Sequence, residues 1–193
     1  MLKDFRQHLQ LHKPVPLADE HAGRVRAAVL VPIIIDGENS RILLTQRAGS
    51  LSSHGGEVAF PGGKEDPDDV SLRATALRET IEEIGIEHSD VEIVGELRPF
   101  ISKFGIAVTP FVGIVPADLG YQANAAEIAS IFEVPVMFFA TNQGIRVDEL
   151  TRHGETHRIL AFSFRGYEIW GLTSMIISEV LRVGLPSVTR EIC

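Results

Sequence analysis

Residues 61–86 read PGGKEDPDDVSLRATALRETIEEIGI, and this stretch predicts a glycine turn followed by a single helix. Asp66 is a suitable N-cap, and Pro67 fits the first helical position, where a backbone N–H has no partner in any case. Gly85 follows the last turn and favours a stop there.

Apolar residues recur along the predicted helix at intervals of three and four, which places them on one narrow face. They are Val70, Ala74, Leu77, Ile81 and Ile84. Glu79, Glu82 and Glu83 fall on the opposite side at i,i+3 and i,i+4 spacing, so the three carboxylates are neighbours. We therefore expect this acidic face to point away from the core.

Three neighbouring carboxylates repel one another. At ~6 Å and an effective dielectric constant of ~20, each pair costs on the order of 3 kcal/mol before screening. A divalent cation that prefers hard oxygen ligands, Mg²⁺ or Mn²⁺, removes this repulsion. An acidic face that is simply solvated is the alternative interpretation, and the helix taken by itself does not separate the two.

The surroundings of the helix resemble the Nudix hydrolase box. The family pattern has Gly, five residues, Glu, seven residues and then Arg-Glu-apolar-x-Glu-Glu-x-Gly-apolar; here Gly63 opens it and residues 78–86, RETIEEIGI, close it. Fourteen residues instead of thirteen separate the two parts, and Thr80 occupies an apolar position. Either Asp66 or Asp69 stands for the first Glu. The extra residue falls in the loop before the helix, so the glutamates keep their register.

A second stretch, upstream of the box, is similar to the extra motif of the coenzyme A pyrophosphatase branch. Residues 43–48 read LLTQRA and residues 56–63 read GEVAFPGG, which match its LLT-x-R-[SA] and G-x3-FPGG segments. The second Arg of that motif falls on Ser52 here. Together the two motifs cover residues 43–86.

The resemblance implies an α/β fold of the α+β type, a Nudix α/β/α sandwich with a mixed β-sheet. It implies a metal-dependent pyrophosphohydrolase in which Glu79, Glu82, Glu83 and the Gly63 carbonyl hold Mg²⁺ or Mn²⁺, while Arg78 holds a carboxylate in place. The implied substrate is coenzyme A or a derivative, cleaved to 3′,5′-ADP and 4′-phosphopantetheine. The alternatives are ADP-ribose, NADH or another nucleoside diphosphate derivative, and a non-catalytic nucleotide-binding domain, against which the intact glutamates argue.

A further carboxylate from outside the box often serves the family as metal ligand or general base. Glu127 and Glu133 are the candidates in this chain. We prefer Glu127 because it follows a loop in the appropriate region. The alternative is that both are surface acids.

Four residues are candidates for contact with the substrate: Arg47, Ser52, His54 and Lys64. Arg47 leaves a predicted strand towards a Gly- and Ser-rich loop, where it contacts phosphate or adenine or else forms a surface ion pair. Ser52 and His54 can bind an anion through hydroxyl, amide and imidazole groups, and Lys64 either meets a phosphate or is solvated. Phe104 lies in a later loop that either faces the substrate, with this ring stacked on a base, or is a plain connector.

The composition argues against nucleic acid and membranes as binding partners. A net charge of −8 argues against nonspecific nucleic-acid binding, which needs a basic face. The only cysteine, Cys193, cannot form an intrachain disulfide, which fits a cytoplasmic protein. The longest apolar stretch, 29–35, is too short to span a bilayer, so no membrane partner is expected. A small-molecule nucleotide substrate and a monomer or homodimer are the expectation.

The chain length of 193 residues predicts one main domain. We expect residues 1–23 to form an N-terminal helix and connector, with Leu2, Phe5 and Leu9 on one face, and residues 24–193 to form a single Nudix hydrolase domain. A closing helix is expected to start at a Thr173 cap. Strands are predicted at 24–35, where Pro32 marks a bulge or an edge, and at 41–46, 57–60, 91–97, 106–115, 127–139 with one helical turn, 144–149, 158–164 and 167–170.

Overall fold

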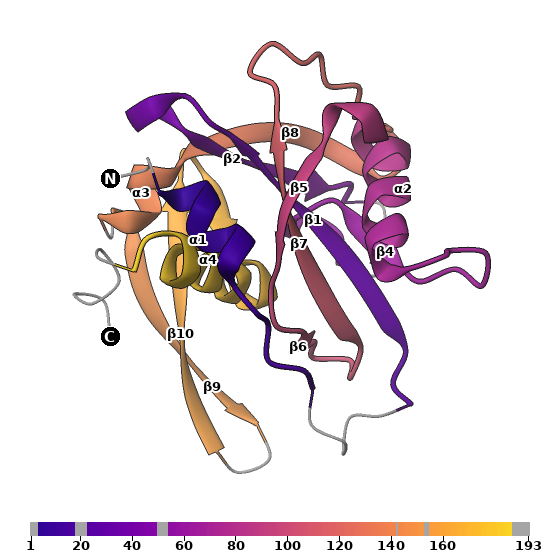
Figure 1. The fold of residues 1–193 in the computed structure, drawn as a ribbon. Coiled ribbons are helices and arrows are strands. Elements are labelled where there is room, and N and C mark those ends of the chain that lie inside the picture. The colour runs from indigo at the N-terminus through magenta and orange to yellow at the C-terminus, as the bar shows by residue number, and fades with distance from the viewer. Residues whose placement is uncertain (1–3, 18–22, 50–53, 142, 153–154, 187–193) are drawn as a thin grey trace.

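A large mixed β-sheet forms the body of the protein in the computed structural model, which describes residues 4–17, 23–49, 54–141, 143–152 and 155–186 (Figure 1). The sheet has eight strands: β1 (Arg26–Ile34), β2 (Arg41–Arg47), β3 (Val58–Ala59), β4 (Gly62–Lys64), β5 (Glu92–Glu96), β6 (Phe100–Ile101), β7 (Ala107–Val115) and β8 (Ile128–Pro135). A second sheet has three strands: β9 (Ile145–Arg152), β10 (Glu155–Phe164) and β11 (Tyr167–Ile169). The helices are α1 (Phe5–Leu11), α2 (Leu72–Ile84), α3 (Val136–Ala140) and α4 (Gly171–Gly184).

Strand β1 lies inside the large sheet and pairs in parallel with β7 along its whole length. On its other side it pairs antiparallel with β4 over Ala27–Val29 and with β2 from Ile33 onward. Pro32 falls in the gap between these two pairings, where its missing N–H breaks no ladder bond on that side. The prediction of a bulge or an edge strand at Pro32 was therefore wrong, because an interior strand accommodates the proline where it changes partner.

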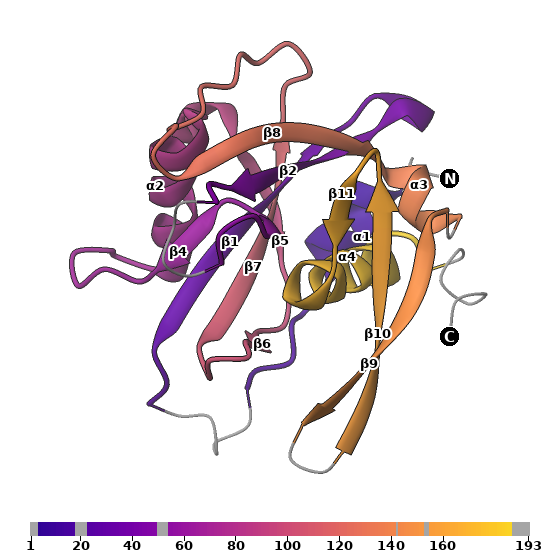
Figure 2. The ribbon, with the colours of Figure 1, turned by 180° about the vertical axis from the view of Figure 1, so that it is seen from behind.

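The helices cover both faces of the large sheet (Figures 1 and 2). On one face, Ala76 and Ile84 of α2 pack with apolar residues of β1, including Leu30. On the other face, α1 and α4 contribute to a larger core cluster that contains Phe5 and Val31. The predicted α/β/α sandwich with a mixed sheet is confirmed.

The acidic helix begins later than the sequence analysis predicted. Its N-cap is Ser71, whose hydroxyl accepts the N–H of Ala74 at 3.2 Å. Asp66 instead closes a local turn, with its carboxylate accepting the N–H of Asp68 at 3.0 Å. A serine that satisfies a helix N–H thus outcompetes an aspartate engaged in its own turn. The predicted end is confirmed, since Gly85 is the C-cap with a left-handed φ of +71°.

Two terminal helices also differ in detail from expectation. Helix α1 starts at Phe5, which is buried together with Leu9, while the predicted contact of Leu2 lies outside the described residues. Helix α4 starts two residues before Thr173, whose hydroxyl does not cap the helix but donates to the Val58 carbonyl at 2.9 Å. That bond ties the start of α4 to strand β3.

The predicted strands are all present, most with shifted ends, and two regions hold more structure than predicted. The predicted glycine turn before the acidic helix contains β4, which pairs with β1. The loop over 99–105, expected either to face the substrate or to be a plain connector, contains β6, which pairs with the start of β7. None of the helices in the described part of the chain is long and apolar enough to cross a membrane.

Candidate active site

Two glycines bring strand β4 unusually close to its neighbours. Gly62 has a φ of +156°, and a Cβ there would lie 2.3 Å from the Ala28 carbonyl oxygen of β1. A Cβ on Gly63 would lie 2.3 Å from Oε1 of Glu79 on α2. No side chain fits at either position without movement, so glycine is required for the helix carboxylates to reach the strand backbone.

Glu83 is buried beneath this strand, with 2% of its surface exposed. The Gly62 N–H donates to its Oε2 at 3.2 Å, and Nη1 of Arg47 donates to its Oε1 at 3.3 Å. Burial raises the pKa of Glu83 to about 7, because these donors only partly replace lost water and Glu79 and Glu127 add negative charge nearby. The expectation that Glu83 faces away from the core was wrong.

The apolar face of α2 is likewise not the predicted stripe. Val70 lies before the helix and is 93% exposed, while Thr80 is fully buried and its hydroxyl donates to the Ala76 carbonyl at 2.6 Å. The buried face is therefore rotated towards Thr80 and Glu83. A polar side chain that satisfies itself within the helix can occupy a core position, which is why hydrophobicity alone misplaced the face.

Glu79 is partly buried beside Gly63. Burial raises the pKa of its carboxyl; Arg78 acts in the opposite direction, and the nearby charges of Glu82 and Glu127 raise it further. Glu82 is more exposed, with about half of its side-chain surface accessible to water. The three carboxylates of the box thus range from buried to solvated along one helix edge.

Arg78 joins the acidic groups into one network. Its Nε and Nη2 each donate at 3.0 Å to the two oxygens of Asp69, and its Nη1 donates to Glu79 at 3.0 Å and to Glu82 at 3.2 Å. Hydrogen bonds from Arg78 hold the pKa of Asp69 well below its usual range. Of the two aspartates left open by the sequence, Asp69 is the one that meets Arg78.

The loop before β8 brings a further acid to this region. The Glu127 carbonyl accepts the N–H of Ala48 at 2.7 Å, which places it at the end of β2 next to Arg47, and its charge raises the pKa of both Glu79 and Glu83. Glu133 is engaged elsewhere: it accepts Nε of Arg41 at 2.6 Å and the hydroxyl of Tyr121 at 2.9 Å.

Of the residues predicted to contact the substrate, only Arg47 contacts a glutamate of the acidic helix in the described part of the chain. Arg47 reaches Glu83, and its buried Nε has no hydrogen-bond partner among the described residues. His54 lies on the loop after β2, where its Nδ1 is 2.6 Å from Oε2 of Glu57. The side chain of Lys64 is exposed at the end of β4. Ser52 lies outside the described residues.

The donor set suits a divalent cation, although it is not arranged as a ready-made metal site. Within the described ranges, no three His, Cys, Asp or Glu side chains are grouped as metal ligands, because Glu79 and Glu82 bind Arg78 while Glu83 turns to Gly62. Carboxylates with raised pKa values are groups whose charge lacks compensation, and hard oxygen donors of this kind prefer Mg²⁺ or Mn²⁺.

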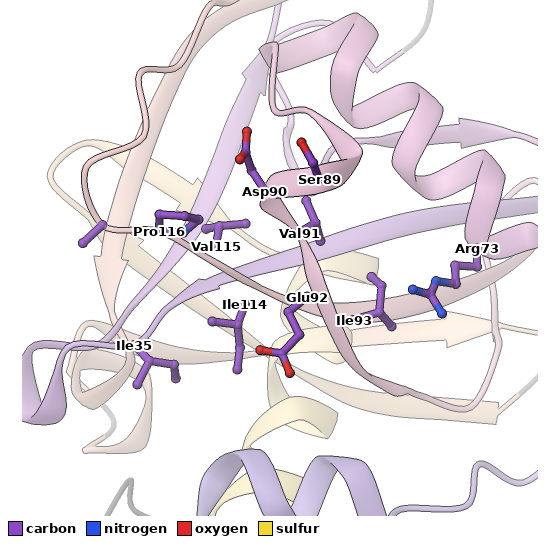
Figure 3. Close-up of a pocket in the computed structure, with 11 residues that line it drawn as sticks. Ile35, Arg73, Ser89, Asp90, Val91, Glu92, Ile93, Ile114, Val115 and Pro116 are labelled. Carbon is purple, nitrogen blue, oxygen red and sulfur yellow. The ribbon is translucent and has the colours of Figure 1, made fainter.

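The site does not coincide with either of two open cavities. One, of about 700 Å³, lies along β5, with Ile35 and Arg73 on opposite sides of it (Figure 3). The other, of about 600 Å³, is lined by Arg41, Tyr121 and Glu133 among others. None of the candidate catalytic residues of α2 lines either cavity.

Comparison with known proteins identifies the family. The NUDIX domain model matches residues 24–134. The uncharacterized Nudix hydrolase NudL of Photorhabdus laumondii is 42% identical over 179 residues, which cover 93% of this chain and 95% of that protein; NudL of Yersinia pestis is 43% identical over 185 residues, which cover 93% and 92%. The crystal structure of a MutT/nudix family protein from Enterococcus faecalis shares the fold, with a TM-score of 0.51 and 17% identity over 99% of this chain and 70% of that one.

The fold and the site define a mixed α+β hydrolase whose helix carboxylates lie against a glycine strand. The chain belongs to the Nudix hydrolase family. Members of this family act on small nucleotide substrates and generally use divalent metal ions, in agreement with the donor set described above.

Two features of the described residues were not predicted from the sequence. The Gly62 N–H is a donor to Glu83, and only the repeated glycine before the helix hinted at such close contact. Trp170, the only tryptophan, ends the predicted strand at 167–170 and lies close to Lys103 with 44% of its surface exposed.

Replacing Gly63 by Ala is expected to lower turnover at least ~10-fold, because the new Cβ displaces the Glu79 carboxylate. Since the group it meets is the end of a flexible side chain, the melting temperature is expected to change little. Steady-state kinetics and thermal denaturation measure the two effects. Gly120→Ala, where a Cβ meets nothing within 4 Å, is the matched control; equal activity in both variants would contradict the close-approach argument.

Replacing Asp69 by Asn is expected to lower the melting temperature at pH 7 by roughly 2–5 °C, because Arg78 loses its bidentate carboxylate. The folded-state pKa of Asp69 is lowered, so its stabilisation is present above about pH 4 and is lost as the pH falls further. The difference between wild type and variant should therefore shrink below that pH. Asp66→Asn, which does not reach Arg78, should show a smaller loss at pH 7, and a larger one would refute the assignment.

Proposed function

We propose that this Nudix hydrolase cleaves the pyrophosphate bond of coenzyme A and its derivatives, releasing 3′,5′-ADP and 4′-phosphopantetheine. The observation that carries the proposal is the arrangement of the two upstream motif segments. LLTQRA and GEVAFPGG lie side by side as β2 and β3, with Thr45 paired to Ala59, and Arg47 at the end of this pair reaches Glu83 of the box. This contact between the motif and the box supports a single site that contains both.

In this proposal Glu79, Glu82 and Glu83, with the Gly63 carbonyl, hold Mg²⁺ or Mn²⁺. When bound, the cation screens the diphosphate, polarises a P–O bond and lowers the pKa of a water molecule. Arg78 orients Glu79 and Glu82 from its fixed position on Asp69, as its bonds to all three carboxylates support.

The remaining proposed roles belong to Glu127 and Arg47. Glu127 accepts the proton of the attacking water, and its electrostatic effect on Glu79 and Glu83 supports its proximity. Arg47 donates to a phosphate oxygen, for which its buried Nε is a suitable donor. We further propose that His54, Lys64 and Ser52 contact other parts of the substrate.

A product assay tests the substrate directly. The protein is incubated with coenzyme A, ADP-ribose and NADH in parallel, each with Mg²⁺, with Mn²⁺ and with chelator, and the products are separated by chromatography. We expect metal-dependent release of 3′,5′-ADP from coenzyme A, well above cleavage of the other two. Preferential cleavage of ADP-ribose or NADH would overturn the coenzyme A assignment while keeping the chemistry.

Replacing Glu83 by Gln is expected to reduce metal-dependent turnover by at least ~100-fold. The fold should survive because the amide oxygen still accepts the Gly62 N–H and the buried charge disappears. Turnover under saturating metal and a melting curve report the two effects. Glu87→Gln, an exposed acid just beyond the helix, serves as the control. Near-wild-type turnover in Glu83→Gln would refute its role as a metal ligand.

A further inference from the structure

Phe104, Trp170 and Lys103 form an exposed group, the aromatic platform, which Lys103 joins to Glu57 after the end of β2. Phe104 is 62% exposed and Trp170 is 44% exposed, which is unusual for large aromatic rings. The Nζ of Lys103 lies 5.2 Å from the centroid of the Phe104 ring and 5.6 Å from that of Trp170. The ammonium group thus links two aromatic rings that come from distant parts of the sequence.

The platform is held by hydrogen bonds that leave its rings open to solvent. The Ser102 hydroxyl accepts the N–H groups of Phe104 at 3.3 Å and of Ile106 at 3.1 Å, which closes a tight turn with Phe104 at its tip. Trp170 directly precedes α4, whose Thr173 donates to the Val58 carbonyl of β3. Both ring-bearing backbones are therefore fixed before any ligand arrives, which reduces the entropy lost on binding.

His54 and Glu57 support the platform from the loop after β2. His54 adopts a left-handed φ of +59°, uncommon for a residue with a side chain, and its ring meets that of Phe104 edge-on, with centroids 5.0 Å apart and planes at 87°. Glu57 accepts Nζ of Lys103 at 3.0 Å as well as contacting His54. Burial raises the pKa of Glu57, but His54 and Lys103 lower it by more, so that the pKa falls below its usual value. The Glu57 carboxylate therefore offsets the charge of Lys103.

The platform adjoins the proposed catalytic residues through one pair of strands. The Glu57 carbonyl accepts the N–H of Arg47 at 3.0 Å, and Gly56 donates back to the Arg47 carbonyl at 3.0 Å. Arg47 in turn reaches Glu83. Glu57, which also accepts Nζ of Lys103, is therefore the backbone neighbour of Arg47.

We propose that the aromatic platform binds the nucleobase of the nucleotide substrate, stacked on the exposed face of Phe104 with Trp170 alongside. This inference rests on the proposed function, because the phosphates must lie at Arg47 and the box for the base to reach the platform. Lys103 has three N–H donors, of which Glu57 takes one, so others are available to ring nitrogens of a purine.

The chemistry of the platform favours a base over a phosphate. Glu57 compensates the Lys103 charge, so the local field attracts an additional anion only weakly. Two partly exposed aromatic rings suit a planar ring instead, and stacking of bases on aromatic side chains tolerates different bases. In the proposed function, Arg47 and the box residues bind the phosphates.

The single tryptophan makes the proposal measurable without turnover. Wild-type protein in chelator is titrated with adenosine 3′,5′-diphosphate, and in parallel with ribose 5-phosphate, which lacks a base, while Trp170 fluorescence is recorded. We expect saturable quenching by the adenine nucleotide and none by the sugar phosphate. No quenching by the adenine nucleotide at millimolar concentration would overturn the proposal.

Variants of Phe104 test the stacking itself. Phe104→Leu keeps an apolar side chain without an aromatic face and is expected to weaken nucleotide binding roughly tenfold, whereas Phe104→Tyr should bind within about twofold of wild type. With coenzyme A as substrate, Phe104→Leu should raise KM and leave kcat nearly unchanged. Leu11→Ala, another exposed apolar residue, is the control for nonspecific effects. Equal binding and KM in wild type and Phe104→Leu would overturn the proposal.

The two proposals fail in distinguishable ways. If coenzyme A is not cleaved but adenine nucleotide still quenches Trp170 in a manner that depends on Phe104, only the substrate assignment fails. If coenzyme A is cleaved with the same KM in wild type and Phe104→Leu and no quenching occurs, the platform inference alone fails.

Discussion

The close approach of α2 to the backbone of β4 is the constraint on which the site depends. It requires glycine at Gly62 and Gly63, since any Cβ would collide with β1 or with Glu79. It also buries Glu83 against a backbone N–H, which leaves a carboxylate with a pKa of about 7. A buried acid with so little compensation is costly in the free protein, and the cation proposed to bind there would recover part of that cost as affinity.

Arg78 explains how the acidic cluster persists in the free protein. Its guanidinium bonds to Asp69, Glu79 and Glu82 replace part of the missing positive charge. Asp69 anchors it from the loop before the helix, so the departure from the usual spacing changes the loop but preserves the contact. A second arginine links the cluster to its surroundings. Arg47 contacts Glu83 and pairs through its backbone with Glu57, which in turn contacts Lys103 of the aromatic platform.

The sequence predicted which helices and strands form better than it predicted which side chains of the acidic helix are buried. The hairpin of β1 and β2 and the helix end at Gly85 follow from local patterns, the sandwich follows from the family resemblance, and all three are present. The burial of Glu83 could not be predicted, because it depends on how close a glycine strand comes in three dimensions and not on helix periodicity. Likewise, the choice of Asp69 over Asp66 depends on the geometry of a turn.

A direct measurement of cation binding tests the central claim, that the α2 carboxylates at β4 form the metal site. Isothermal titration calorimetry with Mn²⁺ would compare wild type with a Glu79→Gln/Glu83→Gln double variant, after thermal denaturation has established that both are folded. The account predicts saturable Mn²⁺ binding by the wild type that is lost in the double variant. Equal binding in the two proteins would place the metal elsewhere and contradict the account.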